Sequence, residues 1–443
     1  MNLLQSIRKN LPSDLASDEL LLVGLSGGAD SVCLLLALQE LGFRVEALHC
    51  NFELRGVESD ADEAFCRRLC RNINVPLSVR HFRTRSFAQR HTLSLEMAAR
   101  QLRYDWFAEV CRQRGAKAVC IAHHRDDNIE TLLLNLVRGT GIHGTTGMKA
   151  VSELNGLSLL RPLLQLGRQD IEDWLTERGQ TWVTDSTNLQ SDAAQRNLIR
   201  LEVLPLLEKL NPRVRETLQE DIQRMTEAEA LYDLAVRGAL KEAMDSDDQL
   251  NIARLSAATS PRTLLYEWLH PFGFNSTQIK EIHEGLEGES GRVWNSATHR
   301  LLRDRGRLLL QEVSPASVDE QVLPLEGLFI SDENVRLLVR RQSVDSSFVI
   351  PRDARVATFD LEKLELPLTL RRVREGDRMQ PFGFDGTRLV SDILTDRKLS
   401  LFEKESQLVV MSGERIVWLV GQRVGAGAEV DAATRHVMQI HLL

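Results

Sequence analysis

The first 190 or so residues alternate short apolar runs with stretches of helical period, and this alternation constrains the fold more than any other feature. Leu20–Leu25 is apolar almost throughout, as expected of a central parallel strand buried on both faces. A helix is predicted over Ser31–Leu41 and a second strand over Arg44–His49. The succession continues to a strand over Ala118–Ala122 and a helix over Asp126–Arg138. It predicts an α/β fold, a doubly wound parallel sheet with helices on both faces.

The pattern changes after about Asn188. Helical period dominates Asn197–Met244 and continues less cleanly to about Glu287, with a polar break at Asp245–Asp248 that we interpret as a loop. Beyond about Ser314, short β-like runs alternate with glycine-rich turns. A chain of 443 residues has room for roughly three domains. The sequence therefore predicts a helical domain after the α/β sheet, followed by a small β-rich α+β domain.

Composition restricts the cellular context. The longest apolar runs, Val32–Leu38 and Ile416–Val420, are far shorter than the ~20 residues that cross a bilayer. No apolar core follows the basic residues near the N-terminus, so a secretory signal peptide is not expected. All six cysteines lie within the first 120 residues, and none forms a Cys-x-x-Cys pair. These features predict a cytoplasmic protein with reduced thiols and no membrane contact.

The net charge of −8 argues against a general nucleic-acid binder, because affinity for phosphate comes from lysine and arginine. The charge is uneven, however. Arg80–Arg103 contains six arginines and one acid, and Arg300–Arg307 forms a second basic cluster. The run Arg371-Arg372-x-Arg374 is a third. Each is either a solvated surface or a local phosphate-binding patch, and we regard the last two as candidates for RNA contact.

Ser26-Gly27-Gly28-Ala29-Asp30-Ser31 joins the first strand to the first helix. Two glycines let the backbone approach a phosphate closely, and the N-terminus of the helix presents unpaired N–H groups. The two serines add hydroxyl groups, and Asp30 is placed to touch a metal ion or cap the helix. In this strand–loop–helix context we expect a phosphate-binding loop rather than a capped turn. It is neither a Walker A loop nor a dinucleotide-binding fingerprint.

A second polar segment, His123-His124-Arg125-Asp126-Asp127-Asn128-Ile129-Glu130, follows the strand at 118–122 and opens a helix. The carboxylates of Asp127 and Glu130 are three residues apart and so share a helix face. They could hold an ammonium group or Mg²⁺ or act as a general base, or simply favour the helix dipole. Adjacent histidines diverge, which disfavours zinc. Arg138-Gly139 ends the helix with donors suited to an anion.

These segments resemble the PP-loop (N-type) ATP pyrophosphatases, and as an ordered set they resemble the tRNA(Ile)-lysidine synthetase family within that group. The set continues with Glu96-x-x-Ala99-Arg100-x-x-Arg103-Tyr104, Arg161–Leu164, Asp185–Asn188, Arg196-Asn197-x-x-Arg200 and Gly376-Asp377-Arg378-x-x-Pro381-x-Gly383. Two departures stand out. Phe52 replaces a histidine that many relatives have, and Thr145–Met148 replaces a Leu-x-Gly-Met run.

The resemblance implies a ligase that uses ATP, together with the Mg²⁺ expected to accompany it. ATP would adenylate the 2-oxo oxygen of the wobble cytidine in the CAU anticodon of the minor isoleucine tRNA, releasing pyrophosphate. Free L-lysine would then displace AMP and give lysidine. The implied domains are a PP-loop ATP-binding catalytic domain at 1–205, a helical tRNA-binding domain at 206–313 and an α+β tRNA-recognition domain at 314–443. A homodimer stays open.

The resemblance also implies roles for individual residues. The loop from Ser26 to Ser31 would hold pyrophosphate, with Asp30 helping to place Mg²⁺. His49 closes the second strand, where the adenine pocket of the family lies. Further side chains would bind the phosphates and the ammonium group of lysine. These are Arg100 or Arg103 and Arg196 for the α-phosphate, Asp127 and Glu130 for the lysine, and Arg138 with Gly139 for an anion.

Three other classes of protein are weighed against this one. A tRNA thiolase of the 2-thiocytidine type shares the loop, but needs cysteine pairs that this chain lacks. A glutamine-dependent amidotransferase needs a nucleophilic cysteine in a second domain, and no cysteine follows Cys120. A non-enzymatic RNA-binding protein would have no use for acidic residues beside an intact phosphate loop.

Overall fold

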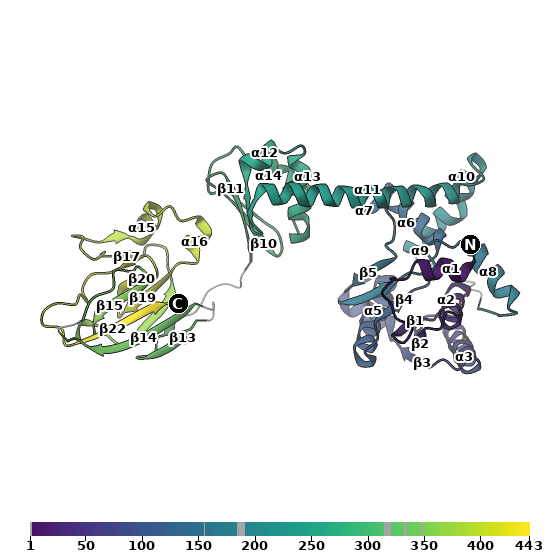
Figure 1. Ribbon diagram of the computed structural model, residues 1–443, viewed down its shortest axis with the longest axis horizontal. Helices are drawn as coiled ribbons and strands as arrows, with labels where there is room; N and C mark the ends of the chain where they lie inside the picture. The colour runs from purple at the N-terminus through teal and green to yellow at the C-terminus, as the bar shows by residue number, and fades with distance from the viewer. Residues whose placement is uncertain (1, 155, 184–190, 314–319, 332–334, 346–347) are drawn as a thin grey trace. The chain divides into compact units, whose positions relative to one another are not determined.

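The computed structural model describes residues 2–154, 156–183, 191–313, 320–331, 335–345 and 348–443, without the side chains of 191–194. It separates into two compact units, Met1–Asp233 and Leu234–Leu443 (Figure 1). Helix α11, Val214–Ala243, runs through the boundary between them. None of the helices in these ranges is long and apolar enough to cross a membrane.

The first unit is built on a six-stranded sheet in the order β3-β2-β1-β4-β6-β5. All neighbouring strands are parallel except the β5–β6 hairpin. Because β2 and β3 lie on one side of β1 and β4 on the other, the strand order reverses between β1 and β4. In an open α/β sheet, ligands bind outside the carboxyl ends of the strands at such a switch point. The strands are β1 Leu20–Gly24, β2 Arg44–Asn51, β3 Leu77–His81, β4 Ala118–Cys120, β5 Val151–Leu154 and β6 Leu157–Leu160.

Helices cover both faces of this sheet, which confirms the predicted doubly wound fold. On one face Leu21 and Val23 pack in a core with α1 (Leu3–Lys9), α2 (Ala29–Glu40), α3 (Val57–Asn72) and α8 (Arg168–Glu177). On the other face Leu22 packs in a core with α5 (Leu95–Arg114), which follows α4 (Thr84–His91). Thr92, in the left-handed conformation, separates α4 from α5. The remaining helices are α6 Arg125–Arg138, α7 Ile142–Thr145, α9 Ser191–Leu198, a π-helical turn Ile199–Val203 and α10 Leu204–Leu210.

The second unit begins with a helical region that also holds a five-stranded antiparallel sheet, β7-β8-β11-β10-β9. Sequence periodicity did not indicate this sheet, because three of its strands have only three residues. The expected loop at Asp245–Asp248 is in part strand β7. The elements are β7 Met244–Ser246, β8 Gln249–Asn251, α12 Ile252–Ala257, α13 Pro261–Leu269, a 3-10 turn His270–Phe272, α14 Ser276–Glu284, β9 Val293–Asn295, β10 His299–Asp304 and β11 Arg307–Glu312.

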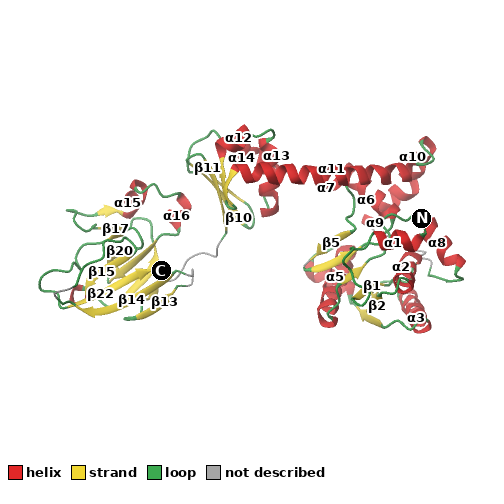
Figure 2. Cartoon of the chain, in the orientation of Figure 1, coloured by secondary structure: helices red, strands yellow, loops and turns green. Residues whose placement is uncertain are grey.

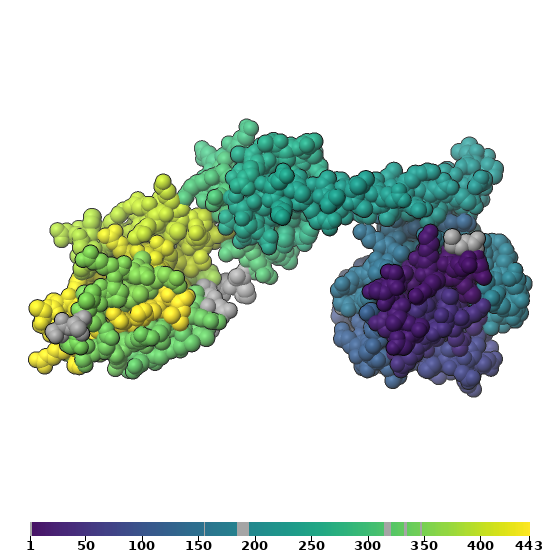
Figure 3. Space-filling view, viewed as in Figure 1, coloured from purple at the N-terminus to yellow at the C-terminus, as the bar shows by residue number. Residues whose placement is uncertain are grey.

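The C-terminal part of this unit is rich in strands, as predicted (Figure 2). Its larger sheets, β12-β16-β19-β20-β21 and β13-β14-β22-β15, share a core that contains Phe359 and Trp418. Figure 3 shows one outer face of this part in green to yellow. The elements are β12 Gln321–Val322, β13 Gly327–Ile330, β14 Arg336–Ser343, β15 Val356–Asp360, a 3-10 turn Leu361–Lys363, β16 Leu368–Arg372, β17 Arg378–Met379, β18 Arg388–Leu389, α15 Val390–Asp396, α16 Leu401–Glu405, β19 Leu408–Ser412, β20 Arg415–Leu419, β21 Arg423–Val424 and β22 His436–Leu442.

Several arginines of the two basic clusters in the second unit have partners within the fold, and the expected contact of these clusters with phosphates stays a prediction. Arg371 is buried and donates two hydrogen bonds to the carboxylate of Asp377, at 2.7 and 2.9 Å. Arg303 donates to the carbonyl of Leu286 at 2.9 Å. Others pair with acids, Arg307 with Asp245 at 3.0 Å, Arg374 with Glu320 at 3.7 Å and Arg300 with Glu405 at 2.6 Å.

Candidate active site

The loop after β1 is held in shape by the hydroxyl of Ser31, which is buried. Its Oγ accepts hydrogen bonds from the N–H groups of Ser26 and Gly27, both at 3.2 Å, and donates to the carbonyl of Gly28 at 2.9 Å. Gly27 has a φ of +95°, which favours glycine at this position. Helix α2 then begins with Gly28 as its N-cap and has no side-chain cap. Its first N–H groups are therefore available to an anion.

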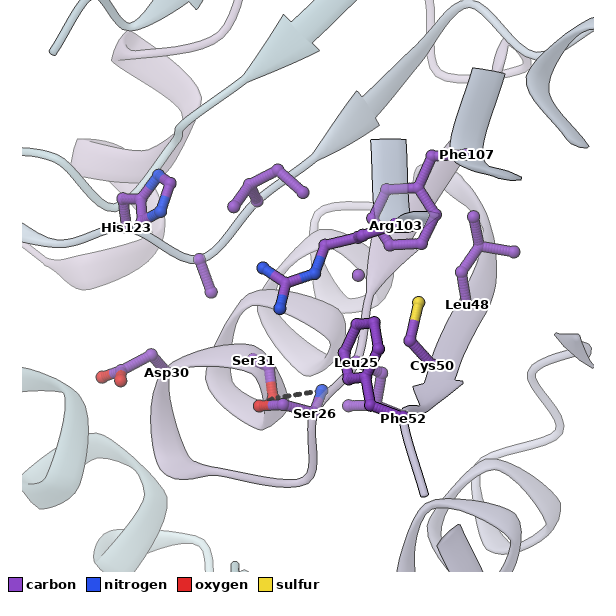
Figure 4. Close-up of a pocket in the computed structure, with 13 residues that line it drawn as sticks. Leu25, Ser26, Asp30, Ser31, Leu48, Cys50, Phe52, Arg103, Phe107 and His123 are labelled. Carbon is purple, nitrogen blue, oxygen red and sulfur yellow. Dashed lines mark hydrogen bonds between the residues drawn. The ribbon is translucent and has the colours of Figure 1, made fainter. Parts of the chain in front are cut away.

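A cavity of about 200 Å³ opens between this loop and β4 (Figure 4). One end is polar, with Ser26, Asp30 and Ser31. The opposite wall is apolar and includes Phe52 and Phe107. The remaining lining residues are Gly24, Leu25, Leu48, Cys50, Arg103, Ile121, Ala122 and His123. An apolar wall facing an anion-binding end suits a nucleotide, which has an aromatic base and a charged phosphate tail.

Arg103 reaches into the cavity from α5. Its guanidinium carbon lies 5.4 Å from the centre of the Phe52 ring, and the group points toward the middle of the pocket in Figure 4. Phe52 in turn stacks on Phe82, with 5.6 Å between ring centres. Phe52, which replaces a histidine found in many relatives, therefore forms part of the cavity wall and contacts the guanidinium of Arg103.

His49 contacts the residue that precedes the loop and does not line the cavity. Its Nδ1 lies 2.9 Å from the carbonyl oxygen of Leu25, the last residue before the loop. Burial lowers the pKa of His49, so the ring is neutral at pH 7 and its Nδ1–H donates to that carbonyl. His49 therefore contacts the backbone that leads into the phosphate-binding loop, and its expected place near the adenine stays a prediction.

Next to the loop, His124 connects two carboxylates. Its Nδ1 accepts from the N–H of Asp126 at 3.2 Å, which leaves Nε2 as the ring nitrogen that faces the carboxylates. That atom lies 3.8 Å from Asp30 Oδ1 and 3.5 Å from Asp127 Oδ2. The other oxygen of Asp30 contacts Arg168 on α8. Burial raises the pKa of Asp30, opposed by the charges of His124 and Arg168.

Asp127 and Glu130 do lie together, as their spacing predicts, and Arg200 lies against both. Glu130 is 1% exposed, and its two oxygens accept from Arg200 at 2.7 and 3.1 Å. The same guanidinium is 3.4 Å from Asp127 Oδ1. Burial raises the pKa of Glu130, opposed by its hydrogen bond with Arg200. Arg200 lies in the π-helical turn, a rare element that is frequent at functional sites.

His123, three residues after β4, lines the cavity and is half-buried against Arg161. The Nε of Arg161 donates to His123 Nδ1 at 3.2 Å, and its Nη1 donates to the carbonyl of Lys149 at 2.8 Å. Burial lowers the pKa of His123 to about 4, so the ring is neutral at physiological pH. Across the described ranges, no group of three or more His, Cys, Asp or Glu side chains is arranged to hold a metal ion.

Several residues named from sequence lie outside the cavity. Arg100 is exposed, with its guanidinium 5.0 Å from the ring centre of Tyr104. Arg138 is exposed and donates to Gln195 at 2.8 Å, while Gly139 ends α6 with a φ of +82°. Arg196 is exposed on α9. The run Asp185–Asn188 lies outside the described residues.

Sequence reasoning assigned no role to three arginines that contact the site. Arg161 and Arg200 were both part of the ordered set of motifs, so the information was present without an assignment. Arg168 begins α8 and reaches Asp30 from a helix 138 residues later in the chain. No local pattern marks that pairing, because it depends on how α8 packs against α2.

An uncapped helix N-terminus and a Ser-Gly-Gly loop at the switch point of a parallel sheet define a PP-loop nucleotide-binding protein. The model of the PP-loop domain matches residues 2–207. Two further models match the second unit, the TilS substrate binding domain at 244–313 and the TilS substrate C-terminal domain at 368–441. The chain belongs to the tRNA(Ile)-lysidine synthase family.

Full-length relatives carry this assignment. The tRNA(Ile)-lysidine synthase of Parabacteroides distasonis is 44% identical over 97% of this chain and 97% of its own length. That of Bacteroides thetaiotaomicron is 41% identical over 95% of each chain. Among solved structures, the U34-tRNA thiolase NcsA from Methanococcus maripaludis is 17% identical with a TM-score of 0.42, covering 51% of this chain and 78% of that one. That weaker likeness carries no part of the assignment.

Proposed function

We propose that this chain is an ATP-dependent ligase that attaches free L-lysine to the wobble cytidine of a CAU anticodon in isoleucine tRNA. The observation that carries the proposal is the meeting of a phosphate-binding loop and a paired acidic site at one sheet edge. This arrangement occurs in a chain that matches tRNA(Ile)-lysidine synthases over nearly its whole length. The reaction proceeds through an adenylated cytidine and gives lysidine, AMP and pyrophosphate.

ATP occupies the cavity with its base against the apolar wall and its phosphates toward the loop. The uncapped N–H groups of α2 and the hydroxyl of Ser26 bind the pyrophosphate that leaves. Arg103 lies between the aromatic wall and the loop, where it neutralises charge that builds up on the α-phosphate. We favour Arg103 over Arg100 for this role, because Arg100 does not line the cavity.

The donor set also fits the Mg²⁺ expected with ATP. Asp30 Oδ1 is buried and has no hydrogen-bond partner among the described residues, and Asp127 lies beside the same histidine. In nucleotide sites Mg²⁺ is held by one or two carboxylates together with the phosphates. Asp30, with Asp127, would hold the ion there, and the ion would supply neutralising charge to the phosphates.

Asp127 and Glu130 are the candidates for binding lysine. The single guanidinium of Arg200 lies against both carboxylates and balances only one of their two charges, so one negative charge is left for an incoming ammonium group. The raised pKa of Glu130 makes it a better proton acceptor than an exposed carboxylate. We propose that Glu130 accepts a proton as the ε-amino group attacks the adenylated base, and that Arg200 balances one of the two carboxylate charges when lysine is absent.

We further propose the division into a catalytic domain at 1–205 and tRNA-binding domains at 206–313 and 314–443. Its support is that the two substrate-domain matches both lie in the second unit.

The thiolase alternative is not favoured. Cys50, the one cysteine that lines the described cavity, is half-buried, and burial raises its pKa to about 12. A thiol with that pKa is fully protonated at neutral pH and is a poor nucleophile or sulfur carrier.

Incorporation of labelled lysine into the CAU isoleucine tRNA tests the proposal. We expect incorporation that requires ATP, with AMP formed in equal amount and only in the presence of that tRNA. A tRNA in which the wobble cytidine is replaced by uridine is the matched control and should accept none. Lysine-independent transfer of sulfur, or no reaction of any kind with the cognate tRNA, would rule the proposal out.

A further inference from the structure

Helix α4 carries arginines that have no acidic partner. Arg83 caps the helix, Arg85 and Arg90 lie within it, and all three are exposed. In the described ranges, none of their guanidinium groups takes part in an ion pair or hydrogen bond. By contrast, Arg80 on the preceding strand is paired with Glu109. These are partnerless cations on a protein whose net charge is −8.

The start of α4 is fixed to the wall of the nucleotide cavity. Thr84 is buried, and its hydroxyl donates to the carbonyl of Phe52 at 2.9 Å. Phe82, two residues earlier, stacks on the Phe52 ring that lines the cavity. The helix therefore projects from the rim of the site, and its distance from the reacting groups is set by buried contacts rather than by a loose loop.

The arginines of α4 do not all face the same way. Thr84 and Ala88 are buried, which fixes the side that packs inward. Arg83 and Arg90 are seven residues apart, close to two turns, so they lie on one flank about 10 Å from each other along the axis. Arg85 lies on the other flank. One side of the helix thus presents two cations at a spacing that can meet different phosphates of a single strand.

We propose that the flank formed by Arg83 and Arg90 binds the phosphodiester backbone of the RNA next to the nucleotide that enters the site. This inference rests on the proposed function, which brings an RNA nucleotide to the cavity. A base that meets the bound ATP at the mouth of the cavity carries its neighbouring phosphates to the rim, and unpaired arginines there attract them without reading sequence. The surface thus positions the anticodon loop without selecting the base.

The test uses the full chain and a short RNA hairpin with the anticodon stem and the CAU loop. Binding is followed by fluorescence anisotropy between about 50 and 200 mM salt for the wild type and the double variant Arg83→Glu/Arg90→Glu. Loss of two phosphate contacts should lower the log–log salt slope by about 1.5. Affinity should fall roughly tenfold at the lowest salt, with a smaller difference at the highest.

The matched control is Arg44→Glu/Arg112→Glu, which changes the net charge by the same amount. Both control residues are exposed and lie toward the opposite end of the parallel strands, Arg44 at the start of β2 and Arg112 near the end of α5. This variant should lose little affinity and keep the wild-type slope. Thermal unfolding confirms that each variant is folded, and Arg83→Gln/Arg90→Gln repeats the test with neutral side chains.

Two outcomes separate this inference from the proposed function. Equal salt slopes for the α4 variant and its control would overturn the α4 surface, whatever the enzyme does with lysine. A wild-type protein that binds the hairpin through α4 but incorporates no lysine would overturn the proposed reaction and keep the surface. Binding of a nucleotide analogue is measured in parallel and should not change, because neither arginine lines the cavity.

Discussion

The arginines of α4 and those of the C-terminal strands resemble each other in the sequence and differ in their partners. Arg371 is 6% exposed and bonded through two nitrogens to Asp377. Arg83 and Arg90 are exposed and have no ion-pair partner in the part of the chain that the structure describes. The buried arginine of the C-terminal strands contributes to the fold, while the exposed arginines of α4 leave their charge available to a ligand. A count of basic residues therefore locates cations without showing which of them can bind phosphate.

A third group of arginines lies between these extremes. Arg168 and Arg200 are partly exposed and pair with carboxylates of the site. Their partners are also the residues that we assign to Mg²⁺ and lysine. Pairing of this kind balances part of the charge of a carboxylate site before substrates arrive, at less desolvation cost than full burial. Burial and the role of the partner then divide the arginines into three kinds. A structural arginine is buried with its partner, a preparatory arginine pairs with a carboxylate of the site before substrates bind, and an available arginine is exposed and unpaired.

The largest effect is expected at the preparatory pair formed by Asp30 and Arg168. Asp30→Ala removes a carboxylate from the phosphate end of the cavity, and should lower tRNA-dependent formation of AMP by at least about 100-fold. The rate is measured by separating labelled AMP from labelled ATP by chromatography. Binding of the anticodon hairpin should change little, because we assign that binding to the surface of α4 and not to Asp30. A variant that forms AMP at close to the wild-type rate would exclude Asp30 from handling the phosphates.

The next effect separates the two half-reactions. Glu130→Gln keeps the size of the side chain but removes its charge, so lysine transfer should fall about 100-fold while adenylation of the tRNA falls less than about tenfold. Single-turnover assays with and without lysine distinguish the steps. Arg200→Gln is the companion variant and should damage lysine use as well. An equal loss in both half-reactions would assign Glu130 to the nucleotide instead.

Much of the catalytic unit could be predicted from sequence. The alternation of apolar runs located β1, β2 and β4, because this feature depends on neighbouring residues only. The phosphate loop was recognisable for the same reason. By contrast, β7 and β9 have three residues each, too few to show a period, so the middle sheet was missed.

The site was predicted in part, and the missing part depends on contacts between distant segments. Asp127 and Glu130 share a helix, so their proximity could be read from their spacing. The pairing of Arg168 with Asp30 spans 138 residues, and that of Arg200 with Glu130 spans 70. Such pairs are created by packing. For the same reason the sequence could not show that Arg371 is buried, whereas Arg90 is exposed.

A smaller effect is expected at the structural pair. Asp377→Asn leaves Arg371 buried beside a neutral partner, and should lower the free energy of unfolding by about 2 kcal/mol at pH 7. Burial acts to raise the pKa of Asp377, but hydrogen bonds from Arg371 and from the N–H of Arg374 outweigh it and lower this pKa below its ordinary value. A depressed pKa stabilises the fold above the unfolded pKa of about 3.9 and loses that contribution as the pH falls through the folded value.

The difference between wild type and Asp377→Asn should therefore be full near pH 7 and should shrink below about pH 4. Urea unfolding at several pH values measures it. A difference that is independent of pH would mean that the packing of Asp377, rather than its charge, is what stabilises the domain. The salt slope of RNA binding should stay unchanged, since a buried pair does not contact phosphate.

The smallest effect, a single neutralisation on α4, gives the sharpest comparison. Arg90→Gln should weaken binding of the hairpin only a few-fold at low salt and lower the log–log slope by about 0.7 to 0.9. Its contribution is purely electrostatic, so it should fade as salt rises, and the unfolding free energy should stay within about 0.5 kcal/mol of the wild type. Arg371→Gln should do the reverse, with a loss of stability that persists in high salt because the pair is shielded from ions. If Arg90→Gln lowered stability and left the salt slope intact, the partnerless arginines would be part of the fold after all. The distinction between available and structural cations would then have to rest on something other than exposure and pairing.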